Sequence, residues 1–182
     1  MTQARPSPAL RAAPDPEPPR CPENRISLSA RIENGRKIID LDGYIPSFLF
    51  RVNSGLSRVA SRWYLDNFGV GLVEWRTIAA LAMEPQIPAR RVCELSGQDK
   101  AAASRSLHLL ARLGHAENAP GVGDPRRKSW RLTATGQALH DRIIEDALER
   151  ERRLIAGIDP EDLETFLQVM RTMRDNIETL DR

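Results

Sequence analysis

Three consecutive cations stand in a short segment that the sequence predicts to be the tip of a loop. The stretch GVGDPRRKSWRLTATG (121–136) opens with a Gly- and Pro-rich turn and continues with Arg126, Arg127 and Lys128. Side chains of this kind are almost never fully buried unless they are paired. Guanidinium and ammonium groups suit the oxygens of phosphate. The stretch therefore indicates contact with a polyanion such as nucleic acid.

The charge of the chain is concentrated in particular segments. The formal net charge is only +2, yet residues 98–131 carry seven Lys and Arg against three Asp and Glu, whereas residues 132–182 carry seven against twelve. The basic segment predicts where a polyanion would bind. A general richness in arginine, with 24 Arg and 3 Lys, is the alternative explanation, but it does not by itself place cations on a loop tip.

Length and composition indicate one domain with appended segments. The chain has 182 residues, of which 41% are hydrophobic and 29% charged, and this is enough apolar material for one core. Cys21 lies in a Pro-rich segment and Cys93 in a helical pattern, so we expect a reducing cytoplasm rather than a disulfide framework. No apolar run approaches the ~20 residues of a membrane span, and a secretory signal is not evident. We therefore expect a soluble cytoplasmic protein.

The N-terminal residues have a different character from the rest. Residues 1–24 hold 7 of the 13 prolines and few apolar side chains, so we expect a disordered tail. The sequence RISLSARI (25–32) alternates apolar and polar residues, and Asn34-Gly35 marks a turn. Residues 25–43 are therefore predicted to form an extended arm or a short strand.

The apolar spacing then becomes helical. Helices are predicted over residues 46–68 and 72–83, and over two shorter segments, 88–95 and 99–113, joined by Ser-Gly-Gln. Two helices separated by a Gly-bearing turn are typical of a helix-turn-helix unit. The next segment (115–119), the basic loop and the alternating SWRL stretch predict a β-hairpin, which we call the wing.

Two further helices follow the wing. One is predicted from Thr133 to about Ile158, and Asp159-Pro160 then opens the last helix with an N-cap and a proline at the first helical position. Apolar residues recur every seven positions along this last helix in two series: Leu163, Met170 and Ile177, and Phe166, Met173 and Leu180. Such a heptad seam belongs either to an intrachain helix pair or to a dimer interface.

Together these segments resemble the MarR family of winged helix-turn-helix transcription regulators. The resemblance covers Tyr44 to Leu180 and rests on GLVEWRTIAALA (71–82), DKAAASRSLHLLARLG (99–114) and DPRRKSWRLTATG (124–136). The last is the most specific, because Asp and basic residues lead there to Leu-Thr-x-x-Gly. The resemblance implies a mainly α fold with a small β-wing, in which a winged helix-turn-helix domain adjoins a helical dimerisation domain formed by the N- and C-terminal helices.

The resemblance also implies boundaries and a mode of action. Residues 44–182 form the MarR-type domain, with 72–132 as its DNA-binding part and 44–68 and 133–182 as its dimerisation part. Members of the family are homodimers whose recognition helices enter adjacent major grooves of a palindromic operator, while the wings reach the minor grooves. The half-sites then lie about one helical turn, ~10 bp, apart. A small ligand usually loosens the complex, so we expect a repressor.

The predicted helix 99–113 resembles the recognition helix of the family, the helix that enters the major groove. Six residues in it or just before it are expected to face double-stranded DNA: Gln98, Lys100, Ala101, Ala102, Ser104 and Arg105. The alanines offer methyl contacts to thymine but no hydrogen bonds, so base readout rests on Gln98, Ser104 and Arg105. Lys100 is expected to contact phosphate. An ordinary solvated cation is the alternative for Arg105.

The wing supplies four more residues by the same resemblance. Arg126 matches the family's minor-groove arginine and Asp124 the carboxylate that orients it, while Arg127 and Lys128 are expected to contact phosphate. A narrow minor groove concentrates negative potential and so favours an inserted arginine. Ser129 stands where the family has a further wing arginine.

Family ligands bind between the first, second and fifth helices. Phe50, Asn53 and Ser57 lie beside the apolar stripe of the first helix, and Trp75 lies early in the second. Two aromatic rings with polar neighbours suit a small aromatic carboxylic acid or its thioester. A plain core role for Phe50 and Trp75 is the alternative.

Other classes of function have less support in the sequence. The three histidines are scattered, so we expect no metal site, and no Gly-rich phosphate loop or catalytic constellation indicates an enzyme or a cofactor. Cys93 lies between Val92 and Leu95 and is predicted to be a buried, inert thiol. A winged-helix dimer that serves as a protein-interaction scaffold, or a redox-responsive regulator, remains the alternative.

Overall fold

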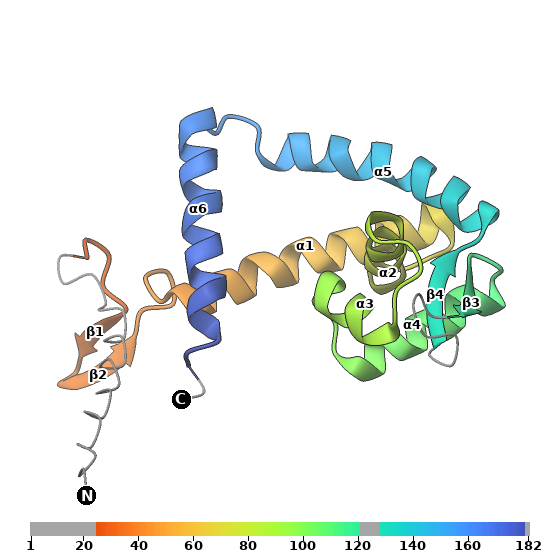
Figure 1. Cartoon of the computed structure of the whole chain (residues 1–182). Helices are drawn as coiled ribbons and strands as arrows, with labels where there is room; N and C mark the ends of the chain where they lie inside the picture. The colour runs from red at the N-terminus through yellow and green to blue at the C-terminus, as the bar shows by residue number, and fades with distance from the viewer. Residues whose placement is uncertain (1–24, 121–127, 181–182) are drawn as a thin grey trace, which may run out of the picture. The chain divides into compact units, whose positions relative to one another are not determined.

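The computed structural model describes residues 25–120 and 128–180 (Figure 1). The Pro-rich tail and the tip of the wing, with Asp124, Arg126 and Arg127, lie outside these residues. The chain divides into two units, one ending at Asn53 and the other beginning at Ser54, and helix α1 (Ile45–Phe68) runs across the boundary.

The N-terminal unit contains a β-hairpin where the sequence predicts an extended arm or a short strand. Strand β1 (Ala30–Glu33) pairs antiparallel with β2 (Arg36–Ile39), so that Glu33 lies opposite Arg36. The two residues between the strands, Asn34 and Gly35, have φ values of 49° and 73°. Positive φ at both positions fits the two-residue turn that matches strand twist. A short strand thus forms within the predicted segment, but it takes up only the last residues of RISLSARI, and the second strand was not predicted.

The helix-turn-helix unit forms as predicted because each helix has a local start or stop signal. Helix α2 (Leu72–Met83) begins where Glu74 accepts a hydrogen bond from the Gly71 amide at 3.1 Å. Helix α3 (Ala89–Ser96) ends at Gly97, whose φ of 66° lies in the left-handed region. Helix α4 (Lys100–Arg112) begins at Asp99, whose carboxylate accepts from the Ala102 amide at 2.8 Å.

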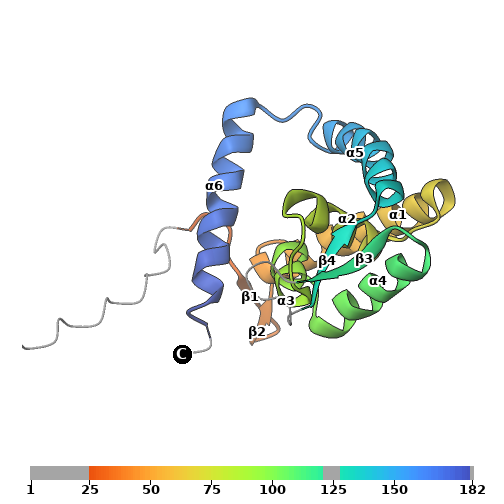
Figure 2. The ribbon, with the colours of Figure 1, turned by 45° about the vertical axis from the view of Figure 1, so that its right-hand side comes forward.

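The predicted wing forms two antiparallel strands directly after α4. Strand β3 (Ala116–Pro120) pairs with β4 (Lys128–Leu132), with Asn118 opposite Trp130. Trp130 also exchanges two backbone hydrogen bonds with Ile87, the residue between α2 and α3. Figure 2 shows β3 beside α4. The wing is therefore joined at its base to the helix-turn-helix unit.

Helix α5 (Ala134–Leu154) starts against the end of α4. The Thr133 hydroxyl caps the helix by accepting from the Gly136 amide at 3.0 Å, and it donates to the Gly114 carbonyl at 2.6 Å. Gly136 lies so close to the backbone of His115 that a Cβ there would overlap its carbonyl group. The Leu-Thr-x-x-Gly motif is thus the joint between the wing and α5.

The end of α5 differs from the sequence prediction. The helix ends at Leu154, four residues before the expected Ile158, and Gly157 has a φ of 83°. A left-handed glycine there turns the chain into α6 (Pro160–Ile177), whose N-cap Asp159 accepts from the Glu161 amide at 2.8 Å. Leu180 lies beyond the end of α6, so the helix does not carry the whole predicted seam.

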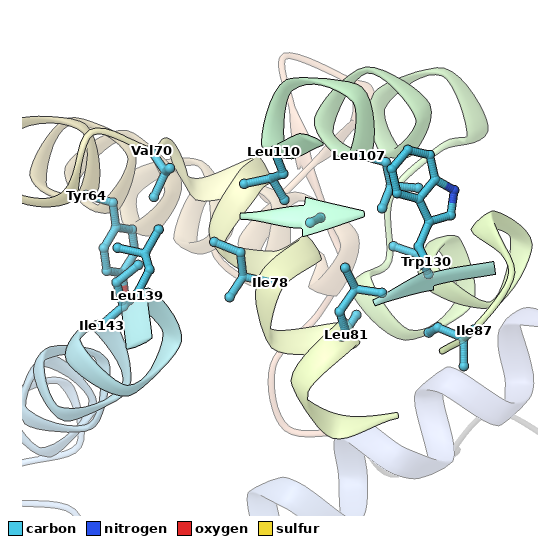
Figure 3. Close-up of a cluster of buried hydrophobic side chains, with 13 residues drawn as sticks. Tyr64, Val70, Ile78, Leu81, Ile87, Leu107, Leu110, Trp130, Leu139 and Ile143 are labelled. Atoms are coloured by element: carbon cyan, nitrogen blue, oxygen red, sulfur yellow. The ribbon is translucent and has the colours of Figure 1, made fainter. Parts of the chain in front are cut away.

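One hydrophobic core unites α2 to α5, the wing and the C-terminal part of α1 (Figure 3). Its members include Tyr64, Val70, Ile78, Leu81, Ile87, Leu107, Leu110, Trp130, Leu139 and Ile143. Leu107 and Leu110 are fully buried and fix one face of α4. Truncation of such a leucine to alanine costs about 2–5 kcal/mol. The buried face of α4 therefore holds the helix so that its opposite face meets solvent.

Helix α6 buries none of its residues, although Leu163, Met170 and Met173 are partly covered. Across residues 25–120 and 128–180, none of the helices combines the length and apolar character needed to span a membrane.

Candidate DNA-binding surface

Four of the predicted DNA contacts lie on one exposed face of α4. Lys100, Ala101, Ser104 and Arg105 are all exposed, and their spacing of three and four residues places them on one side of the helix. The opposite side carries the fully or nearly fully buried residues Ala103, Ser106, Leu107 and Leu110. The helix thus offers solvent a surface with two cations, a hydroxyl and a methyl group. Ala102 is half-buried between the two faces.

Gln98, which the sequence predicts to contact bases, points inward in this structure. Its side-chain amide donates to the Val73 carbonyl at 2.9 Å and to the Thr77 hydroxyl at 3.2 Å. Its Oε1 is buried and accepts no hydrogen bond from the described residues. A base contact requires the amide to leave both partners on α2, so it stays a prediction.

An ion-pair cluster connects the end of α2 to α3. Arg91 donates to Glu84 through Nε at 2.8 Å and through Nη2, and its Nη1 donates to Glu94 at 3.1 Å. The hydrogen bonds from Arg91 lower the pKa of both carboxyl groups, and those from Glu84 and Glu94 raise the pKa of the guanidinium. These carboxylates therefore stay charged at neutral pH, and Arg91 links the end of α2 to α3 through them.

The base of the wing presents one of the four predicted wing residues. Lys128 begins β4 and is exposed, whereas the other three lie outside the described residues. Ser129 is buried, and the single proton of its hydroxyl is shared between the carbonyls of Ala119 and Pro120, each 3.0 Å from the Oγ. The serine at this position therefore holds the two strands together instead of facing DNA. Two residues further along β4, Arg131 forms an ion pair with Glu117 across the strands at 2.7 Å.

His108 belongs to the exposed face of α4, although no contact was predicted for it. It follows Ser104 by four residues, is exposed, and meets the ring of Trp130 edge-on at 5.5 Å between centroids. The imidazole thus connects the solvent face of α4 with the wing strand β4. The sequence could have indicated this position, because His108 follows Ser104 by four residues and Arg105 by three, which places it on the same side of a helix.

Cys93 is half-buried rather than buried, which corrects the prediction. Its thiol donates to the Ala89 carbonyl at 3.2 Å and lines a hollow of about 390 Å³ between α3 and α4. Lys100 and Ser104 line the same hollow from α4. Among the residues that the structure describes, no cluster of three or more His, Cys, Asp or Glu side chains could hold a metal ion.

Trp75 of the predicted effector site is half-buried on α2. Its ring lies 6.0 Å from that of Tyr64 and 5.6 Å from that of His140, so aromatic groups from α1 and α5 flank it. It also lines an open hollow of about 220 Å³ together with Arg76, Ala79, Ala80, Met83, Leu95 and Ser96.

The other three predicted effector contacts lie on α1. Ser57 is half-buried in the same unit as Trp75. Phe50, which is 71% exposed, and the exposed Asn53 belong to the N-terminal unit. That these residues form one pocket with Trp75 stays a prediction.

Several solved structures that are similar to this chain are regulators of transcription. No family model matches the sequence, and no curated protein matches it. A MarR/EmrR-family regulator from Acinetobacter sp. ADP1 is 25% identical, with a TM-score of 0.74, and the match covers 78% of this chain and all of that one.

Two more distant neighbours share the fold. MepR of S. aureus, solved as a DNA complex, is 16% identical with a TM-score of 0.65, over 72% of this chain and 95% of its own. CouR of Rhodococcus jostii RHA1, solved with p-coumaroyl-CoA, is 17% identical with a TM-score of 0.66, over 74% of this chain and 94% of its own.

Further neighbours of 18% to 25% identity are also MarR-family regulators. The chain therefore has the winged helix-turn-helix fold of these MarR-family transcription regulators and is similar to them in structure.

Proposed function

We propose that the protein is a ligand-responsive repressor that binds a palindromic operator as a homodimer. The observation that carries the proposal is the exposed face of α4, where Lys100, Ser104 and Arg105 lie together opposite a fully buried face. A helix held in this way fits the major groove of B-DNA, which is about 12 Å wide. The relation to MepR, solved as a DNA complex, supports the same use of the fold.

The proposal assigns DNA binding and dimerisation to different parts of the chain. Residues 72–132 contact DNA, with α4 in the major groove and the wing, including Asp124, Arg126, Arg127 and Lys128, along the flanking backbone and minor groove. Residues 44–68 and 133–182 supply the dimer interface. In support, Phe166 and Ile177 on α6 expose 53% and 62% of their surfaces, and apolar groups exposed along one helix favour association.

A small aromatic carboxylic acid, or its thioester, is the proposed effector. Trp75 lies between two other rings at the side of a hollow, and Arg76 on the same hollow offers a cation for a carboxylate. CouR was solved with p-coumaroyl-CoA, which is a thioester of this class. Ser57 and the residues Phe50 and Asn53 are proposed to complete the contacts.

Selection of genomic DNA fragments by the purified protein tests the proposal. We expect one or a few near-palindromic sites, protected from cleavage over two half-sites about one helical turn, ~10 bp, apart. The aromatic acid should release them, and Trp75→Ala should weaken that release while operator binding in its absence stays the same. A single asymmetric half-site would contradict the dimeric arrangement.

Salt dependence separates the repressor from a protein-interaction scaffold. A DNA-binding winged helix loses affinity steeply as salt rises, because phosphate contacts release counterions. A scaffold would show no sequence preference and little retention on DNA at physiological salt.

A further inference from the structure

A small polar cluster lies inside the apolar core between α2 and α4. Thr77 of α2 and Ser106 of α4 are 0% and 1% exposed, and the Ser106 hydroxyl donates to the Thr77 hydroxyl at 2.8 Å. Gln98, in the turn before α4, donates to the same Thr77 oxygen at 3.2 Å. Three segments of the helix-turn-helix unit thus converge on one hydroxyl group.

The hydrogen-bonding capacity of Thr77 is fully used. Its hydroxyl donates its single proton to the Val73 carbonyl at 3.0 Å and accepts from both Ser106 and Gln98. A hydroxyl has one proton and two lone pairs, so no further bond is possible. A buried O–H or N–H group that loses its acceptor destabilises the fold, because it is left without a hydrogen bond. Ser106 and Gln98 are therefore held in their positions relative to Thr77.

Two members of the cluster are close in sequence to the exposed residues of α4. Ser106 directly follows Arg105, and Gln98 precedes Lys100 by two residues. Apolar packing by Leu107 and Leu110 prevents α4 from leaving the core, but dispersion contacts have little directional preference. Hydrogen bonds do depend on direction, so they fix the rotation and the axial position of α4 more closely than the apolar contacts do.

We propose that Thr77, Ser106 and Gln98 form a polar clamp that sets the rotation of α4 against α2, and with it the affinity for the operator. These are positioning residues, because they act on DNA through Lys100 and Arg105. The inference rests on the proposed DNA-binding function of α4. It gives Gln98 a role inside the protein in place of the predicted base contact.

The clamp has one weak arm. Gln98 satisfies its two N–H groups on α2, whereas its Oε1 is buried without a partner among the described residues. An unpaired buried acceptor opposes the inward orientation, since water would satisfy it outside. The Ser106 arm has no such penalty, and Ser106→Ala should therefore affect the rotation of α4 more than Gln98→Ala does.

Thr77→Val is the main test, because it keeps the shape of the side chain and removes the shared oxygen. We expect operator affinity to fall about tenfold, because two of the three hydrogen bonds that are lost join α2 to Ser106 and Gln98. Affinity for non-specific DNA and the slope of log K against log salt should not change, because no phosphate contact is removed. Adding Ser106→Ala should weaken binding little further, since both changes remove the same bond.

Thr172→Val provides the matched control. Its hydroxyl also donates to the carbonyl four residues before it, Gln168, but at an exposed position on α6. Thr172 belongs to neither of the two apolar series that are proposed to form the dimer seam, so this variant should bind the operator like the wild type. Melting temperatures of all variants establish that binding is compared between folded proteins.

Hydrogen exchange decides the question independently of DNA. Loss of the clamp should speed exchange over residues 98–106 and leave α5 unchanged. If folded Thr77→Val keeps wild-type exchange over 98–106, or keeps wild-type operator affinity, the clamp is refuted. If the wild type shows no sequence preference at all, the proposed repressor fails. Faster exchange confined to 98–106 would still support the clamp in that case.

Discussion

Arg105→Ala is the most direct test of the exposed face of α4. Arg105 is exposed, and within residues 25–120 and 128–180 no hydrogen bond or ion pair engages it. Its removal should therefore change the free energy of unfolding by no more than about 0.5 kcal/mol. A guanidinium that contacts a guanine through two hydrogen bonds contributes about 1–3 kcal/mol of base discrimination. Each half-site should accordingly bind roughly 5- to 150-fold more weakly.

The assay is fluorescence anisotropy with the selected operator and with single-base variants of it. Arg105→Ala should both weaken binding and narrow the differences between variants. Lys100→Ala should instead weaken all sequences alike and make the salt slope shallower by about one unit. Arg171→Ala, an exposed arginine on α6, is the control for general charge. If Arg105→Ala binds and discriminates like the wild type while Arg171→Ala does not, the assignment of α4 is wrong.

Three other variants test the wing, the last helix and the ion-pair cluster. Arg126→Ala should cost roughly 1–3 kcal/mol of operator affinity, measured by the same anisotropy titration, and leave the melting temperature unchanged. Met173→Glu should turn a dimer into a folded monomer in light scattering, because a charge is placed in the apolar seam. The hydrogen bond from Arg91 lowers the pKa of Glu84 below its ordinary 4.5, so the pair stabilises the fold above that pH and loses this effect as pH falls through the lowered pKa. Arg91→Ala should therefore flatten the acid side of the melting temperature plotted against pH.

The helices and the wing could be predicted because their signals are local. Asp99, Thr133 and Asp159 each act as N-caps, and Gly97 ends α3, as their positions in the sequence indicate. The β1–β2 hairpin had a local signal too, since Asn-Gly is a preferred two-residue turn, but the weak alternation after it concealed the second strand. Local chemistry thus accounts for most of the secondary structure.

The orientation of side chains was harder to predict, because it depends on partners distant in sequence. Gln98 is 21 residues from Thr77, and only the packing of α4 on α2 brings them together. The end of α5 was misplaced for a related reason. Ile155 and Ile158 continue the helical apolar spacing beyond Leu154, so the sequence predicts a longer helix. The helix nevertheless ends at Leu154, and the left-handed Gly157 then turns the chain. Cys93 was predicted to be buried from its apolar neighbours, whereas its exposure depends on the hollow that α3 and α4 form between them.

The glycine of the Leu-Thr-x-x-Gly motif has a consequence for how such sequences are interpreted. Gly136 is required by the contact of its backbone with His115, and Thr133 by the cap of α5, so neither residue needs DNA to explain it. A related protein that kept this joint but no longer bound DNA would still need both Thr133 and Gly136. The motif is therefore a marker of shared ancestry and architecture. Whether a given descendant still regulates genes must be judged from the charges on α4 and the wing.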